Sequence, residues 1–437
     1  MMKRWLGLSL IFMLCAALTL AGCGQEEAAP VENDPDNAGV GQLTEVETVY
    51  IGVLLPLSGS QAAVAAGNNA RAAMEVAADV INNSHDIDWE LAQAAGLADY
   101  GGAKVELRFA DCGTTTAGAR QAVKGLMDLG VVAVLGCCSS DMTAAVALAC
   151  AHYGVPMISG SAKDYRLTDG SYDLGDHFYR IGGTDAQETA LFLDFLSQLS
   201  LRNNLGVRTV AIAYMDNEAG RHAEELLEEA VEASSFTEVA VISYAPDEKD
   251  LADEAAKIVN NQPDAIFQIG GVGDTAAFVN AYAQTRYQPK AVICYGAPFQ
   301  NPTFAAAVNG AGADFYYGAV VSPDTAYADG AEAAEKKDSL QTAASLYTYI
   351  NGLSQAKTGV AMDNSALLEF AAVIVAAQAV SAAGTTDSAA FAEQLQNNIF
   401  AAPYLFSGTI DFGENGQNTV TPSYPARLTE GRYAYAL

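Results

Sequence analysis

The chain has 437 residues, of which 52 are acidic and 22 are basic, for a formal net charge of −30. Nucleic acids and anionic lipid surfaces are bound through clustered lysines and arginines, so this composition argues against both as partners. Hydrophobic residues make up 51% of the chain, which is ample for a core. The length corresponds to two or three domains.

The N-terminal residues have the features of a secretory leader. Lys3 and Arg4 precede an apolar run over 5–20, and small residues lead to Cys23. This ending resembles a bacterial lipoprotein signal, which implies removal of 1–22 and lipid attachment at Cys23. The protein is then expected outside the cytoplasm, anchored to the cell membrane. An ordinary leader with an incidental cysteine is the alternative.

The segment 23–47 predicts a flexible acidic tether. It is rich in Glu, Asp, Asn, Pro and Gly and has almost no large apolar residues. Such a composition cannot bury enough surface to offset the entropy of ordering. The tether would let a globular domain stand off the membrane.

From residue 48 the chain alternates between short apolar runs and segments with helical spacing. The first apolar runs, rich in β-branched residues, are 50–55, 105–109, 131–135 and 155–158. The segments 68–83 and 141–153 have apolar residues at helical positions i, i+3, i+4 and i+7. Apolar strands that alternate with helices indicate a parallel sheet covered on both faces.

The same alternation starts again after residue 183. Predicted strands at 207–215, 239–244, 265–269 and 292–295 alternate with helices, and long alanine-rich helices follow residue 323. We therefore predict an α/β fold of two doubly wound parallel-sheet lobes with a ligand cleft between them. The expected lobes are 48–183 with 323–400, and 184–322 with 401–437. The most apolar later stretch, 367–383, reads as a core helix because Glu369 and Gln378 interrupt it.

Several loops and strand ends, taken in order and spacing, resemble one known family. The segments are Pro56-Leu57-Ser58-Gly59, Asp79-Val80-Ile81-Asn82, Asp111-Cys112, Cys137-Cys138-Ser139-Ser140, Val155-Pro156-Met157-Ile158-Ser159 and Tyr179-Arg180. They resemble the leucine/isoleucine/valine-type substrate-binding lipoproteins of ABC transporters, which have the periplasmic binding protein type I fold. The resemblance covers residue 50 to the C-terminus. It implies a monomer, without cofactor or catalysis, that captures a branched-chain amino acid or related compound and delivers it to an ABC permease.

Ser139 and Ser140 follow a predicted strand and precede a predicted helix. Hydroxyl groups there, with the N–H groups of the helix start, suit a carboxylate. The resemblance assigns Ser139 to the ligand carboxylate, gives Ser140 a supporting role and includes Cys138 in the ligand loop. Capping of the helix by Ser139, Ser140 or Asp141 is the alternative, and it is compatible with ligand binding.

Two further contacts follow from the resemblance. Ser161 lies in the second ligand loop, where hydroxyl and backbone groups contact the amino and carboxylate ends of the ligand. Phe370 matches an aromatic residue near the ligand side chain. The alternatives are a simple turn at Ser161 and core packing for Phe370.

The chain also departs from the family pattern. The family's other ligand-facing aromatic residues are replaced here by Ala66, Ala219 and Val272. The family also has an acidic residue that pairs with the ligand amino group. The corresponding stretch of this chain, between Lys290 and Asp314, contains no Asp or Glu.

A buried ammonium without a partner would cost several kcal/mol. We therefore expect either that Asp185 replaces the missing acid, or that the ligand is not an amino acid. Tyr295 and Phe299 are the candidates for a replacement aromatic wall.

The mature chain contains Cys23 and five further cysteines. The resemblance implies a disulfide that joins Cys112 to Cys138, or to Cys137 as the alternative, and fixes the serine loop. Small buried apolar residues are the other interpretation of these cysteines. No Cys-x-x-Cys pair occurs in the sequence and the histidines are scattered, so no metal site is expected.

Two alternatives to transport remain open. The same fold could serve as a sensor whose closure is read by a signalling partner, or, with weaker support, as an extracellular hydrolase using His152 or His177 as a base. The Gly271-Val272-Gly273 segment follows a strand and opens a helix, but no acid is placed to bind a ribose. We therefore interpret it as strand–helix packing.

Overall fold

The structure is a computed structural model that describes residues 47–436 except 138, 247, 286, 296–301, 309–315, 322–336, 421–422 and 430–431. The predicted leader, nearly all of the tether, the lipidation site Cys23, Cys138 and Phe299 lie outside the described residues. From Val46 onward the chain forms one compact unit, which contains two lobes, each with its own sheet.

The first lobe is built on a parallel sheet with the strand order β2-β1-β3-β4-β5. Its strands are β1 (Thr48–Leu55), β2 (Lys104–Asp111), β3 (Val134–Gly136), β4 (Met157–Ser159) and β5 (Phe178–Arg180). The central strands β3 and β4 are buried along their whole length, as expected for short apolar runs covered on both faces.

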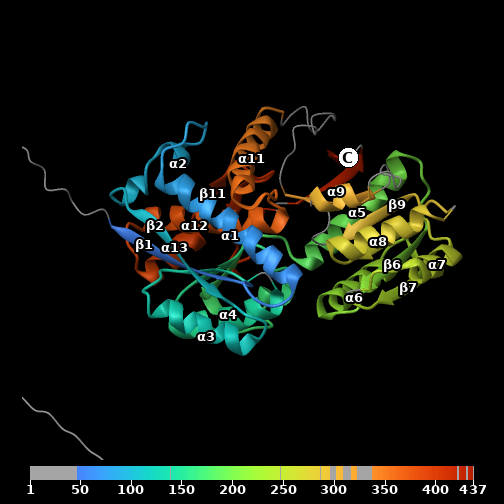
Figure 1. Ribbon diagram of the computed structural model, residues 1–437, viewed down its shortest axis with the longest axis horizontal. Coiled ribbons are helices and arrows are strands. Elements are labelled where there is room, and N and C mark those ends of the chain that lie inside the picture. Colours follow the sequence, from blue (N-terminus) through green and yellow to red (C-terminus); the bar gives the residue numbers. More distant parts are fainter. Residues whose placement is uncertain are drawn as a thin grey trace, which may run out of the picture. The chain divides into compact units, whose positions relative to one another are not determined.

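Helices cover both faces of this sheet, as the sequence predicted. Figure 1 shows α3 and α4 on one side and α1 and α12 on the other, and two separate apolar clusters fill these interfaces. The helices of this lobe are α1 (Gln61–Asn82), α2 (Glu90–Gln93), α3 (Thr116–Met127), α4 (Ser140–Tyr153), α11 (Lys337–Thr358), α12 (Asn364–Ala383) and α13 (Ser388–Asn397), with short 3-10 turns η1 (Ala98–Tyr100), η2 (Tyr165–Leu167) and η3 (Gly175–His177).

The helix α12 is the central helix of the first core. By length and composition alone it could cross a membrane, but 78% of its most apolar window is buried inside the protein. A helix that is apolar all round belongs in a core. It packs along α1 and carries one buried acid, Glu369.

The second lobe has a seven-stranded sheet in the order β14-β13-β10-β9-β8-β6-β7. The strands β6 to β10 are parallel, whereas β13 and β14 add an antiparallel edge. The strands are β6 (Thr209–Met215), β7 (Thr237–Tyr244), β8 (Ala265–Ile269), β9 (Ala291–Tyr295), β10 (Tyr316–Val320), β13 (Tyr424–Thr429) and β14 (Arg432–Tyr435). The helices are α5 (Asp185–Arg202), α6 (Glu218–Glu232), α7 (Ala252–Asn261), α8 (Val272–Ala283) and α9 (Pro302–Ala307).

The glycine-rich start of α8 serves packing, as predicted. The Asp274 carboxylate accepts hydrogen bonds from the Gly271 N–H (3.0 Å) and the Tyr244 hydroxyl (2.6 Å). The carboxylate therefore ties the start of α8 to β7.

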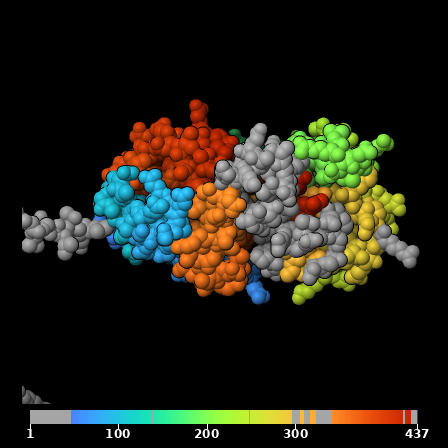
Figure 2. Space-filling view, turned by 90° about the horizontal axis from the view of Figure 1, so that it is seen from above, coloured from blue at the N-terminus to red at the C-terminus, as the bar shows by residue number. Residues whose placement is uncertain are grey.

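One predicted lobe boundary is wrong. The hairpin of β11 (Ile399–Ala402) and β12 (Gly408–Asp411) was expected to begin the return to the second lobe at residue 401. Instead Phe400, Tyr404, Ile410 and Phe412 are buried in the first apolar core. Figure 2 shows this red-orange segment beside the blue surface of the first lobe. The chain returns to the second lobe only after Phe412, because these aromatic side chains complete the packing around α12.

Candidate functional site

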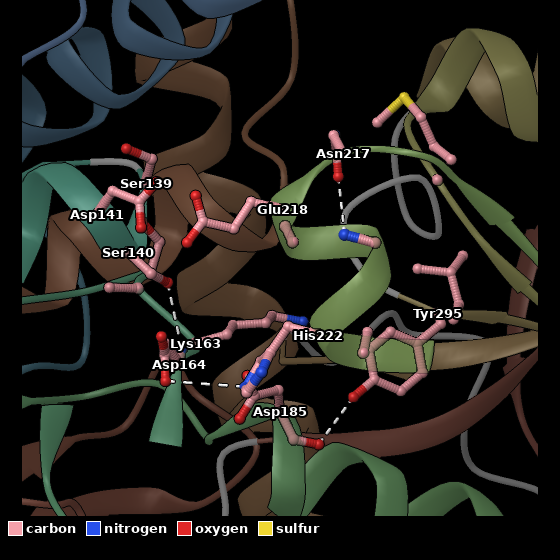
Figure 3. A pocket seen from close by; sticks show the side chains of 18 of the residues that line it. Ser139, Ser140, Asp141, Lys163, Asp164, Asp185, Asn217, Glu218, His222 and Tyr295 are labelled. Atoms are coloured by element: carbon pink, nitrogen blue, oxygen red, sulfur yellow. Dashed lines mark hydrogen bonds and ion pairs between the residues drawn. The ribbon is translucent and has the colours of Figure 1, made fainter. Parts of the chain in front are cut away.

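A cavity of about 350 Å³ lies between the lobes. Its first-lobe wall includes Ser139 and Ser140, and its second-lobe wall includes His222 and Tyr295 (Figure 3). Ser161 also lines the first-lobe wall. Most of these side chains follow the carboxyl ends of parallel strands, which is where open α/β sheets bind ligands.

The start of α4 faces the cavity. Ser139 occupies the N-cap position, yet within the described part of the chain its side chain makes no capping hydrogen bond. The Ser140 hydroxyl accepts a hydrogen bond from the Asp164 N–H at 3.2 Å, which leaves its hydrogen available to a ligand. The helix start and these hydroxyls together suit an anionic group.

The strand that leads into this loop depends on a glycine. Gly136 has φ +105, and a Cβ there would lie 2.2 Å from the Leu54 carbonyl oxygen. A larger residue would therefore push β3 away from β1 and displace the serine loop.

The second loop sits directly on α12. A Cβ at Gly160 would lie 2.6 Å from the Leu368 carbonyl oxygen, so the loop and the helix backbone are in close contact. Next to it, the Ser161 N–H and hydroxyl both donate to Glu369 Oε1, at 3.1 Å and 2.7 Å. Burial raises the pKa of the Glu369 carboxyl to about 7, partly offset by these hydrogen bonds and one from the Gly160 backbone.

Acidic side chains gather next to Ser140, whose hydroxyl is bonded to the Asp164 N–H. Asp185 Oδ2 lies 3.0 Å from His222 Nε2, and Asp164 Oδ1 lies 3.8 Å from the same nitrogen. The His222 ring stacks on Tyr165 with centroids 5.6 Å apart. Burial raises the pKa of Asp185, against the opposing effects of His222 and of hydrogen bonds from the Tyr165 and Ala186 backbone. Asp185 is thus a buried carboxyl at the cavity wall.

The carboxylate of Asp164, unlike that of Asp185, is held by an arginine. Burial alone would raise its pKa, but the Arg166 hydrogen bonds outweigh burial and keep the pKa below its usual value. Arg166 binds both carboxylate oxygens, with Nε–Oδ1 at 2.9 Å and Nη2–Oδ2 at 2.5 Å.

Among the described residues, Asp164, Asp185 and His222 form a group with metal-ligand spacing, their ligand atoms lying within 4.8 Å of one another. Because Arg166 engages both oxygens of Asp164, we interpret the group as an ion-pair network.

A second carboxyl pair crosses the cleft. Asp141 stands in the first turn of α4 and Glu218 in the first turn of α6, and both line the cavity (Figure 3). A hydrogen bond with Asp141, followed by the charge of Asp141, raises the pKa of Glu218. A neighbouring carboxyl thus favours the protonated form of Glu218.

The structure brings five of the predicted ligand residues together around this one cavity: Ser139, Ser140, Ser161, Asp185 and Tyr295. The Tyr295 hydroxyl is hydrogen-bonded to the Asp185 carbonyl oxygen (2.8 Å) and to Thr189 Oγ1 (2.9 Å), so it ties β9 to α5. Cys138 lies outside the described residues.

The prediction for Phe370 is wrong. Its side chain is fully buried in the first core, with its ring centroid 6.5 Å from that of Trp89 and 5.0 Å from that of Tyr404. Aromatic packing around α12 therefore explains Phe370 without a ligand.

The cysteines of the described chain are buried. A hydrogen bond with Cys137 lowers the pKa of Cys112 despite burial. Burial raises the pKa of Cys150 to about 12. The pairing of Cys112 with Cys138 involves a residue outside the described chain.

Sequence reasoning missed four residues of this region. Glu218 and His222 follow the end of β6, and the rule that ligands gather at strand ends could have indicated them. Asp164 follows the Ser161 loop by three residues. Glu369 is the one acidic residue in an apolar helix. Because burial of a carboxyl costs free energy, its position in the sequence could have indicated a specific role.

Comparison with known proteins identifies a family that the chain matches. A family model described as periplasmic binding protein matches residues 48–432. No curated protein sequence matches the chain.

Solved structures with the same fold include three substrate-binding proteins. The branched-chain amino acid transporter protein LivJ of Streptococcus pneumoniae, in complex with isoleucine, is 20% identical with a TM-score of 0.67, covering 89% of this chain and 98% of that chain. The leucine binding protein LivK of Thermotoga maritima is 16% identical with a TM-score of 0.66 over 89% and 98%. A solute binding protein of R. palustris, in complex with benzoate, is 16% identical with a TM-score of 0.65 over 88% and 94%.

These likenesses agree with the two-lobed α/β architecture. The family consists of extracytoplasmic proteins that bind small molecules for ABC transporters. Since the family model spans both lobes and most of the chain, this protein belongs to the periplasmic binding protein family.

Proposed function

We propose that this protein is a lipid-anchored solute-binding protein that captures an α-amino acid, with a medium-sized aliphatic side chain or a close relative of one, and delivers it to an ABC permease. The observation that carries the proposal is the distribution of charge in the cavity. Hydroxyls at the start of α4 and the buried carboxyl of Asp185 line the same cavity, the hydroxyls suited to an anionic group and the carboxyl to a cationic one.

A zwitterionic ligand matches both the hydroxyls at the start of α4 and the Asp185 carboxyl. The positive end of α4 and the Ser139 and Ser140 hydroxyls favour a carboxylate. Asp185 favours an ammonium, and it takes the place of the acid that the family pattern has and this chain lacks. A benzoate-type ligand would satisfy the hydroxyls and bring no cation to Asp185, whose carboxylate would keep only His222 and backbone N–H groups as partners.

The size and walls of the cavity fit a small ligand. Its volume of about 350 Å³ is near the lower end of roughly 300 to 1,000 Å³ for ligand pockets. Met215, Ala219, Ala223 and Ile269 supply apolar surface beside the Tyr295 ring. This surface favours an aliphatic side chain.

Anchoring and delivery complete the proposal. Cys23 carries the lipid, the acidic segment 23–47 is the tether, and the ligand-closed lobes dock on the permease as a monomer. Closure around a ligand requires no chemical step.

The test is a thermal-shift and calorimetry screen of the mature chain, made with Cys23→Ser to remove the lipid, against the twenty α-amino acids, 4-methylpentanoate and benzoate. An amino acid at a hundredfold excess over its Kd should stabilise the protein by about 2.7 kcal/mol. Binding of benzoate with no response to any amino acid would refute the proposal. Labelling of the wild type, but not of Cys23→Ser, with a radioactive fatty acid would test the anchor.

A further inference from the structure

Glu369 is the buried group of the first lobe that the proposed function does not yet use. Its side chain is fully buried in an otherwise apolar helix. Among the described residues, Oε2 has no hydrogen-bond partner, while Oε1 accepts two hydrogen bonds from Ser161. A buried carboxyl costs free energy, so the hydrogen bonds that it accepts from Ser161, a cavity residue, call for an explanation.

The geometry fixes which way the Ser161 hydroxyl points. A backbone N–H can only donate, so Glu369 Oε1 must be an acceptor at its 3.1 Å contact with the Ser161 N–H. The Ser161 hydroxyl approaches the same oxygen at 2.7 Å and therefore donates its single hydrogen there. This direction holds when Glu369 is ionised and when its proton is on Oε2.

The loop cannot turn away from this contact. Gly160 lies against the Leu368 and Glu369 backbone so closely that a Cβ would have no room. The Ser161 side chain lines the cavity. It therefore presents only oxygen lone pairs to a ligand, which accept a hydrogen bond but cannot donate one.

We propose that Glu369 is a positioning residue that holds the Ser161 hydroxyl as a hydrogen-bond acceptor toward the cavity, so that Ser161 receives the ammonium of the ligand and rejects a carboxylate at that point. The inference rests on the proposed amino-acid ligand and assigns Ser161 to its amino end. Glu369 itself touches no ligand.

The experiment compares L-leucine with 4-methylpentanoate, which is leucine without its amino group, by calorimetry on the mature chain. Loss of one hydrogen bond to a charged group changes affinity by about tenfold or more. In Ser161→Ala, leucine binding should weaken about tenfold while 4-methylpentanoate changes less than about twofold. Ser345→Ala, a surface serine bonded within its own helix, is the matched control and should change neither.

Two variants of Glu369 separate positioning from packing. Glu369→Gln keeps an oxygen acceptor and should retain the leucine preference within about twofold. Glu369→Met fills the same apolar space and frees the Ser161 hydroxyl, so the preference for leucine should fall by at least about threefold. Equal weakening of both ligands by both variants would show a packing role and overturn the inference.

Failure of the proposed function has a different signature. Wild-type protein that binds leucine no better than 4-methylpentanoate, or binds neither, contradicts the amino-acid proposal. The Ser161–Glu369 contact is then tested by urea unfolding of Ser161→Ala, Glu369→Met and the double variant. Additive changes in the midpoint would overturn the inference, and non-additive changes would support it.

Discussion

Replacement of Glu369 by Gln should remove a specific part of the pH dependence of stability. The carboxyl is fully buried, and burial raises its pKa from 4.5 to about 7. A glutamine has nearly the same shape and never ionises. The difference between wild type and variant therefore isolates the proton of this one group.

The sign and size follow from linkage. The folded protein holds the proton more tightly than the unfolded chain, so this contribution is fully present below pH 4.5 and is lost as the pH rises through 7. Each pH unit between the two pKa values corresponds to about 1.4 kcal/mol. The free energy of unfolding of the wild type should thus fall by about 3 kcal/mol more than that of Glu369→Gln between pH 4.5 and 8.

Other acids do not obscure this signal. The titratable groups on elements packed against α12 are half-buried or exposed; they are Arg71, Glu75, Asp79, Asp99, Tyr100 and Glu393. Urea unfolding at half-unit steps of pH, followed by circular dichroism, measures the slopes. Glu393→Gln on the exposed face of α13 is the matched control and should follow the wild type. Parallel curves for wild type and Glu369→Gln would refute the buried-carboxyl argument.

Three further changes test other parts of the site. Asp185→Asn should weaken leucine binding by at least about tenfold and leave 4-methylpentanoate binding unchanged, because only the ligand amino group loses a charged partner. Calorimetry measures both affinities, and equal losses for the two probes would contradict the assignment of Asp185 to the amino group. Ser139→Ala combined with Ser140→Ala should weaken both probes alike, since both carry the carboxylate, and a loss confined to leucine would reverse the orientation of the ligand. A hydrogen bond with Asp141 raises the pKa of Glu218, so raising the pH should ionise Glu218 opposite Asp141 and favour separation of the lobes of the ligand-free protein; small-angle scattering from pH 5 to 8 should show this expansion in the wild type and not in Asp141→Asn.

The fold was largely predictable because each lobe repeats a local pattern. The apolar run 50–55 lies in β1, and the segment with helical spacing, 68–83, coincides with the second half of α1 and its C-cap. The exceptions depend on long-range packing. Phe400 and Phe412 join the first core although the sequence placed the return to the second lobe at residue 401. No local pattern indicates which of two cores an aromatic residue will enter.

The site was predictable where it lies at strand ends and unpredictable where it depends on contacts through space. Ser139 and Ser161 follow β3 and β4, so their convergence on one cavity was expected. The contact of Asp185 with His222 joins the start of α5 to α6, and sequence spacing gives no sign of it. Phe370 was misassigned since a buried aromatic and a ligand-facing aromatic look alike in an apolar helix.

Two serines of similar appearance in the sequence acquire opposite roles from their partners. The Asp164 N–H donates to the Ser140 hydroxyl, so the Ser140 hydrogen remains free to donate to a ligand. Glu369 accepts the hydrogen of Ser161, so Ser161 retains only lone pairs. The first lobe therefore offers a donor and an acceptor to the same cavity before any contact with the second lobe. A ligand with adjacent carboxylate and ammonium groups satisfies both serines, whereas a simple acid satisfies one, and this asymmetry is what favours an amino acid over a benzoate-type ligand.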